Sequence, residues 1–106
     1  MKRLILIEKE NTWEEAIKTA SQNIKDDETV ILVWKEGVKR CIRCEPELFK
    51  ILHQFILDGG KAYVCLKSLK KFDIPETRPP EAFERIEDGE DLIKDLKNKG
   101  FEIVKF

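Results

Sequence analysis

The sequence lacks the features expected of a membrane, secreted or nucleic-acid-binding protein. Its apolar runs, such as Val30–Trp34, are far shorter than the roughly 20 residues that span a bilayer. The apolar start Leu4–Ile7 stops at Glu8, which is too short for the core of a signal peptide. Positive and negative charges nearly cancel, with 20 Lys and Arg against 21 Asp and Glu, so nothing indicates nucleic acid. We therefore expect a cytoplasmic protein without membrane or nucleic-acid partners.

Cysteine and glycine are also scarce, and this excludes some types of site. Three cysteines are an odd number, so the pattern does not indicate a disulfide-stapled secreted scaffold. The segment Glu8–Thr12 contains no glycine, whereas dinucleotide and P-loop sites need glycine there so that backbone amides can approach phosphate. A phosphorylatable receiver domain would need an aspartate where Cys65 stands. No bound cofactor is therefore predicted.

The residues that are present suit one compact domain. The chain has 106 residues, the size of a single core, and 42% of them are hydrophobic. Charged residues make up 39%, well above the average of roughly 25%. The abundance of Lys and Glu is typical of proteins from hot environments, where ion-pair networks stabilise more effectively. We expect a single α/β domain over residues 1–106, with a thermophile-like composition.

Apolar runs alternate with segments of helical spacing. The runs predict strands at Leu4–Ile7, Thr29–Trp34 and Ala62–Leu66, a short fourth strand at Phe83–Ile86 and a last strand at Phe101–Phe106. Such alternation is typical of a parallel sheet with helices on both faces. The fold class predicted is a three-layer α/β sandwich around a mainly parallel five-stranded sheet. Ligands in such sheets bind beyond the carboxyl ends of the strands, so the candidate loops follow Ile7, Trp34, Leu66, Ile86 and Phe106.

Start signals and apolar stripes define the helices. Thr12 and Glu15 match a capping box, in which the threonine side chain caps the helix and the glutamate reaches back. Pro46 suits the first turn of a second helix. Asp88 can cap the last one. The predicted inner faces are Trp13, Ala16, Ile17, Ala20 and Ile24 in the first helix, Leu48, Phe49, Leu52, Phe55 and Ile56 in the second, and Leu92, Ile93 and Leu96 in the last.

Cys65 is the main candidate for a catalytic residue. It ends a predicted central strand, just before Leu66–Lys71, and Lys67 and Ser68 are the supporting candidates. If Leu66 begins a helix, its amides and the nearby lysines favour the thiolate, which is the nucleophilic form. The alternative is a buried cysteine that packs as a small apolar residue.

Cys41 and Cys44 form a C-x-x-C pair whose role stays open. A redox pair would begin a helix directly after a strand, but Pro46 places the helix after the pair. A zinc site would need further ligands, and only Cys65 and His53 are available. We therefore expect two partly exposed thiols that bind no metal, and His53 as a partly buried helix residue.

Three segments resemble the DsrE/DsrF/TusD group of small sulfur-transfer proteins. Val33–Val38 resembles that group's strand and acidic-Gly-Val turn. Leu52–Cys65, with its Gly59-Gly60 turn, resembles its helix and the strand that ends in the sulfur-carrying cysteine. Glu87-Asp88-Gly89 and Val104–Phe106 resemble its closing helix and strand.

The resemblance implies a flavodoxin-like fold and a persulfide on Cys65 that passes sulfane sulfur between donor and acceptor proteins. The chain departs from the group at Lys71–Ile74, where many members have small residues that end in Arg-Gly, and in its charged first loop. The resemblance also implies a trimeric or hexameric homo-oligomer. Trp34, Phe72 and Phe106, large side chains near predicted turns, agree with buried contacts between subunits.

Overall fold

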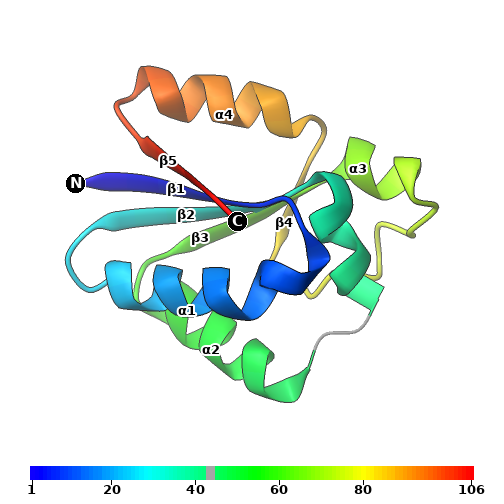
Figure 1. Cartoon of the computed structure of the whole chain (residues 1–106), viewed down its shortest axis with the longest axis horizontal. Helices are drawn as coiled ribbons and strands as arrows, with labels where there is room; N and C mark the ends of the chain where they lie inside the picture. The colour runs from blue at the N-terminus through cyan, green and yellow to red at the C-terminus, as the bar shows by residue number, and fades with distance from the viewer. Residues whose placement is uncertain (43–44) are drawn as a thin grey trace.

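A parallel five-stranded sheet forms the middle of the molecule (Figure 1). The computed structural model describes residues 1–42 and 45–106. The strands lie in the order β4-β3-β2-β1-β5, and every neighbouring pair is parallel. This confirms the predicted three-layer α/β sandwich, although the order differs from the 2-1-3-4-5 order of flavodoxin. The strands are β1 (Lys2–Ile7), β2 (Glu28–Val33), β3 (Lys61–Cys65), β4 (Glu84–Ile86) and β5 (Glu102–Lys105).

The order of the strands decides which face each helix covers. From β1 to β3 the chain advances in one direction, and right-handed crossovers place α1 and α2 on the same face. The chain then returns past β1 to form β5, so that α4 covers the opposite face, as Figure 1 shows. The helices are α1 (Trp13–Asn23), α2 (Pro46–Leu57), α3 (Leu66–Lys71) and α4 (Gly89–Asn98), with short 3-10 helices at Glu10–Thr12 and Lys35–Ile42.

The two faces of the sheet belong to two separate hydrophobic cores. Successive strand residues point to opposite faces, so Ile5 and Ile7 enter one core while Leu4 and Leu6 enter the other. The α1–α2 core contains Ile5, Ile7, Trp13, Ala16, Ile17, Ala20, Ile31, Val33, Val38, Cys41, Leu48, Leu52, Phe55, Ala62, Val64, Leu69, Ile74 and Phe83. The α4 core contains Leu4, Leu6, Val30, Leu32, Trp34, Cys65, Leu96 and Phe101.

Some local predictions are wrong. Thr12 makes no cap with its side chain, because its hydroxyl donates to the Lys9 carbonyl at 2.8 Å within the 3-10 turn that precedes α1. The predicted capping box with Glu15 is therefore absent. Phe49 is not buried but 39% exposed, on the outer face of α2. Asp88 does cap α4, since its side chain accepts the Glu90 N–H at 3.0 Å.

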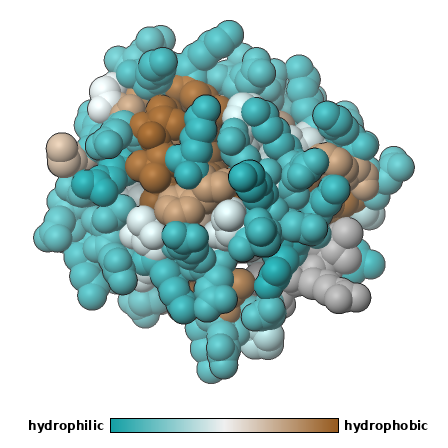
Figure 2. Space-filling view, in the orientation of Figure 1, coloured by the Kyte–Doolittle hydropathy of each residue, from teal (hydrophilic) through white to brown (hydrophobic). Residues whose placement is uncertain are grey.

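The surface in Figure 2 is mostly hydrophilic, and a brown, apolar patch lies in the region where Figure 1 shows β5. Strand β5 lies at an edge of the sheet, and Ile103, Val104 and Phe106 are only partly buried. Among the described residues, no helix is long and apolar enough to cross a membrane.

Candidate functional site

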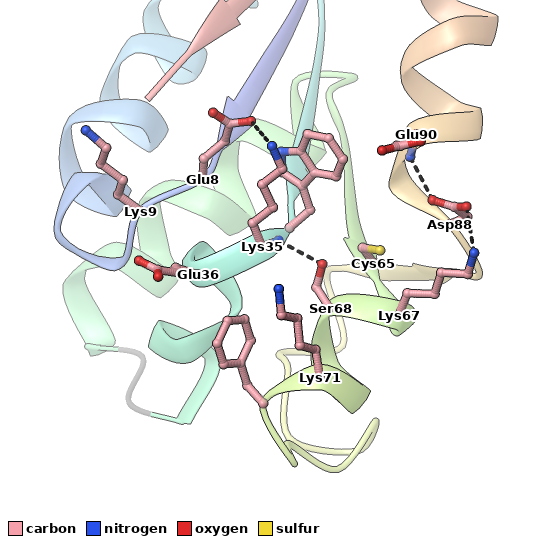
Figure 3. A pocket seen from close by; sticks show the side chains of 12 residues that line it. Glu8, Lys9, Lys35, Glu36, Cys65, Lys67, Ser68, Lys71, Asp88 and Glu90 are labelled. Carbon is pink, nitrogen blue, oxygen red and sulfur yellow. Dashed lines mark hydrogen bonds and ion pairs between the residues drawn. The ribbon is translucent and has the colours of Figure 1, made fainter.

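A cleft of about 510 Å³ opens at the carboxyl ends of β1, β2 and β3, beside the start of α4 (Figure 3). The candidate loops after Ile7, Trp34, Leu66 and Ile86 all contribute to it. Its side chains carry both signs of charge. The lining residues are Glu8, Lys9, Trp34, Lys35, Glu36, Cys65, Lys67, Ser68, Lys71, Phe72, Asp88 and Glu90.

Cys65 ends β3 and forms part of the cleft wall. Its Sγ accepts a hydrogen bond from the backbone N–H of Gly89 at 3.3 Å. The residue is only 2% exposed, so the thiol is buried at the cleft wall. The first residue of α4 lies against the sulfur, 24 positions further along the chain, where sequence reasoning had no means of placing it.

Gly89 allows α4 to begin this close to the sheet. A Cβ at this position would lie 3.0 Å from Trp34 Cε3, 3.3 Å from Leu32 Cδ2 and 3.5 Å from the Cβ of Cys65. The first two distances are tighter than ordinary van der Waals contact. A side chain at this position would therefore push the helix start away from the sulfur.

Asp88 and Lys67 form an ion pair beside Cys65 (Figure 3). The Lys67 ammonium donates to Asp88 Oδ2 at 2.9 Å. This hydrogen bond, together with that from the Glu90 N–H, lowers the pKa of Asp88. The Asp88 carboxylate in turn raises the pKa of Lys67. Both groups are thus charged at neutral pH, and the structure joins the predicted supporting residue Lys67 to α4 rather than to the sulfur.

Ser68, the second supporting candidate, forms a hydrogen bond with the backbone of Lys35. Its Oγ accepts the Lys35 N–H at 2.7 Å. Lys35 has a φ of 52°, in the left-handed region that few non-glycine residues adopt, so this hydrogen bond helps to hold an unfavourable conformation. The Lys35 ammonium lies 4.4 Å from the centre of the Trp34 ring and 3.5 Å from Glu8 Oε2.

Trp34 has a buried hydrogen-bond donor without a partner. The residue is 8% exposed, as expected of the end of a buried strand, and its Nε1 donates to no described residue. By contrast, Trp13 Nε1 donates to the Gly37 carbonyl at 2.7 Å. Buried polar groups almost always have partners, so this donor is an exception that a water or a ligand acceptor would satisfy.

The other sulfur and imidazole candidates lie elsewhere. Cys41 is buried in the α1–α2 core, whereas Cys65 belongs to the α4 core on the other face of the sheet. Cys44 lies outside the described residues. His53 is exposed on α2, not partly buried as predicted, and it lines a different pocket with Pro46 and Phe49. Within the described part of the chain, no group of three potential metal ligands occurs.

Sequence reasoning placed the site at the strand ends but gave no role there to Trp34, Lys35 or Gly89. Gly89 follows the predicted cap Asp88 and lies in one of the segments that resemble the DsrE/DsrF/TusD group, but neither signal places its N–H at Cys65. Trp34 precedes one of the candidate loops, but only tertiary structure shows that its indole N–H lacks a partner.

Comparisons with known proteins show the fold and no more. No family model matches the sequence, and no curated protein matches it. The chain is similar to the solved structure of a protein of unknown function, MTH1491 from Methanobacterium thermoautotrophicum, with a TM-score of 0.80, 14% identity and 100% of both chains covered.

Two further solved structures share the fold. A conserved protein of unknown function, BT1422 from Bacteroides thetaiotaomicron, has a TM-score of 0.72 at 16% identity, over 99% of this chain and 95% of that one. The ychN protein from E. coli has a TM-score of 0.64 at 13% identity, with both chains covered completely. The chain thus shares its whole architecture with small proteins from distant organisms. Two of these proteins, MTH1491 and BT1422, are described as being of unknown function.

Proposed function

We propose that this chain carries sulfane sulfur as a persulfide on Cys65 and passes it from a donor protein to an acceptor protein. The observation that carries the proposal is the hydrogen bond from the Gly89 N–H to Cys65 Sγ in the wall of a cleft. An N–H donor at the start of a helix stabilises an anionic sulfur more than a neutral one. The resemblance of three sequence segments to the DsrE/DsrF/TusD group supports the same function.

The chemistry needs only one thiol. The Cys65 thiolate attacks the terminal sulfur of a donor persulfide, R–S–SH. The new bond joins Sγ to that sulfur, the donor's S–S bond breaks, and its electron pair leaves with the donor as a thiolate, R–S⁻. The proton stays on the transferred sulfur. An acceptor thiolate then attacks the same sulfur and releases Cys65 as a thiolate, so no metal or external oxidant is required.

The burial of Cys65 supports a second candidate function. A cysteine that is 2% exposed and packed in the α4 core could serve only to fill space in a non-catalytic binding or assembly module. In the sulfur-carrier proposal, the start of α4 moves aside while the donor is engaged. The two functions differ in whether Cys65 reacts while the protein is folded.

Intact-mass spectrometry after incubation with a protein persulfide donor tests the proposal. We expect the wild type to gain the mass of one sulfur atom, which a reductant then removes. Cys65→Ser is nearly isosteric, so it should keep the fold and lose the gain. A Cys65 that stays unmodified until the protein is denatured would establish the packing function instead.

The other two cysteines provide the matched control. We expect the double variant Cys41→Ser with Cys44→Ser to load sulfur as the wild type does, because Cys41 lies on the opposite face of the sheet from Cys65. Loss of loading in this variant, with Cys65 intact, would instead support a thiol redox function for the C-x-x-C pair.

We also propose that the chain assembles into a homo-oligomer, a trimer or a hexamer. An edge strand leaves one row of backbone groups unpaired, and β5 adds partly buried apolar side chains to such an edge. Light scattering at micromolar concentration should give three or six times the mass of the chain. A monomer at that concentration would contradict this assembly.

A further inference from the structure

We propose that Asp88 is a positioning residue for the Cys65 thiol: by capping α4 and pairing with Lys67, it holds the Gly89 N–H on Sγ. The inference rests on the proposed function only for the choice of Cys65 as the reacting group. The inference predicts the pH dependence of Cys65 alkylation, which needs no sulfur donor. The inference and the proposed function can therefore fail separately.

The contacts around Asp88 form a closed link between β3 and α4. The carboxylate accepts the Glu90 N–H at 3.0 Å through one oxygen and the Lys67 ammonium at 2.9 Å through the other. The Lys67 backbone N–H also donates to the Glu87 carbonyl at 3.3 Å. Lys67 follows Cys65 by two positions, and Gly89 directly follows Asp88. The link therefore fixes the two chain segments whose sulfur and amide meet at 3.3 Å.

The charge on Asp88 and its position act on the sulfur in opposite directions. A carboxylate near a thiol opposes formation of the thiolate by repulsion. The hydrogen bond from Gly89 favours the thiolate, because a donor bonds more strongly to a charged acceptor than to a neutral one. The Lys67 ammonium, which pairs with Asp88 at 2.9 Å, offsets part of that repulsion.

A second, independent feature shows that this cleft is more than packed core. Trp34 is more than nine-tenths buried, lines the same cleft and has an Nε1 donor without a partner among the described residues. An orphan donor is costly in a wall that only fills space. It fits a site where a ligand acceptor arrives next to a prepared thiol.

The test is the pH profile of Cys65 alkylation by iodoacetamide, in a background with Cys41→Ser and Cys44→Ser. For Asp88→Ala we expect the midpoint of the profile to rise by roughly 0.5 to 1 pH unit, as one weakened hydrogen bond to a charged sulfur predicts. Below the midpoint, alkylation should then be about 3 to 10 times slower. Asp88→Asn keeps the cap but loses the ion pair with Lys67, so its midpoint should lie below that of Asp88→Ala.

The direction of the shift separates position from charge. The charged residues that share the cleft with Cys65 are Glu8 and Lys9 after β1, Lys35 and Glu36 after β2, Lys67 and Lys71 in α3, and Asp88 and Glu90 at α4. If Asp88 acted only through its charge, its removal in either variant would lower the midpoint. If its role were merely structural, loosening α4 would raise the rate at high pH without moving the midpoint. Either result would overturn the proposal.

Two further variants guard against unfolding and indirect effects. Asp95→Ala removes the Asp95–Lys99 ion pair from the same helix, away from the sulfur, and should leave the midpoint unchanged. Gly89→Ala moves the donor itself and should raise the midpoint as Asp88→Ala does, which keeps the test valid if Asp88→Ala does not fold. Circular dichroism reports folding. Sulfur loading of the same variants by mass shows separately whether the proposed function holds.

Discussion

The two faces of the sheet differ in how they are held and in what they offer. The α1–α2 core lies under two helices and contains the large, fully buried side chains Trp13, Phe55 and Phe83. The α4 core lies under one helix, in which Gly89 and Leu96 are the buried residues. Cys65 and Trp34 both belong to this less covered side.

The difference indicates that the two faces of the sheet have different roles. Interdigitated packing on the α1–α2 side fixes the strands, because close-packed cores respond to the loss of even one methylene group. On the other side, hydrogen bonds at the start of α4 hold that helix near Cys65 rather than extensive packing. A helix held in this way can shift without disturbing the sheet.

Matched leucine truncations give the largest expected effects and test this contrast directly. Leu52 of α2 is fully buried in the α1–α2 core, and Leu96 of α4 is slightly exposed in the α4 core. We expect Leu52→Ala to reduce the free energy of unfolding by about 4 kcal/mol and Leu96→Ala by about 2 kcal/mol, because the residual cavity is larger where neighbours cannot collapse. Urea unfolding measures both. Equal losses would contradict the contrast.

Two glycine substitutions sharpen the contrast at a smaller scale. A Cβ at Gly37 would collide with the Ile7 backbone carbonyl, which cannot move without breaking β1. At Gly89 the nearest atoms belong to the Trp34 and Leu32 side chains, and the helix itself can shift. We expect losses of about 3 kcal/mol for Gly37→Ala and about 1 kcal/mol for Gly89→Ala in urea unfolding. A larger loss at Gly89 would mean that α4 is as rigidly held as the strands.

The strand pattern made most of the fold predictable. Apolar segments identified all five strands, and the observed ends differ from the predicted ones by at most two residues. The helix starts at Thr12, Pro46 and Asp88 were predicted at the right residues, but the hydrogen bonds of the caps were less predictable because they depend on local geometry. Asp88 caps as predicted, whereas the backbone at Thr12 turns as a 3-10 helix and directs its hydroxyl to Lys9.

The sequence predicted where the site lies, but not that Cys65 is buried there. The rule that sites lie beyond strand ends located Cys65 and the loops around it. Its burial could not be predicted, since the covering amide comes from Gly89, in an element distant in sequence. The same holds for the link between Lys67 and Asp88. Sequence patterns indicate which side of a helix or strand is buried. They do not indicate which residues of two elements come into contact, as Cys65 and Gly89 do.

The smallest expected effect is a pH dependence that compares one exposed ion pair on each side of the sheet. The pKa of Asp88 is lowered by its hydrogen bond with Lys67, and that of Glu14 in α1 by its hydrogen bond with Lys18. A carboxyl with a lowered pKa in the folded state stabilises the protein above its unfolded pKa, about 3.9 for Asp and 4.3 for Glu. That stabilisation is lost as the pH falls through the lowered value.

Asp88→Asn and Glu14→Gln should therefore lower the urea midpoint slightly at pH 7, and the difference from wild type should shrink towards pH 3. The Asp88 pair joins α4 to α3, whereas the Glu14–Lys18 pair lies within one helix. Exposed pairs within a helix contribute little, so the change for Asp88→Asn should be the larger of the two. Because packing holds α1 in place, Glu14→Gln should leave Cys65 alkylation unchanged. A difference that persists at pH 3, or a larger effect for Glu14→Gln, would show that charge pairs do not hold the start of α4.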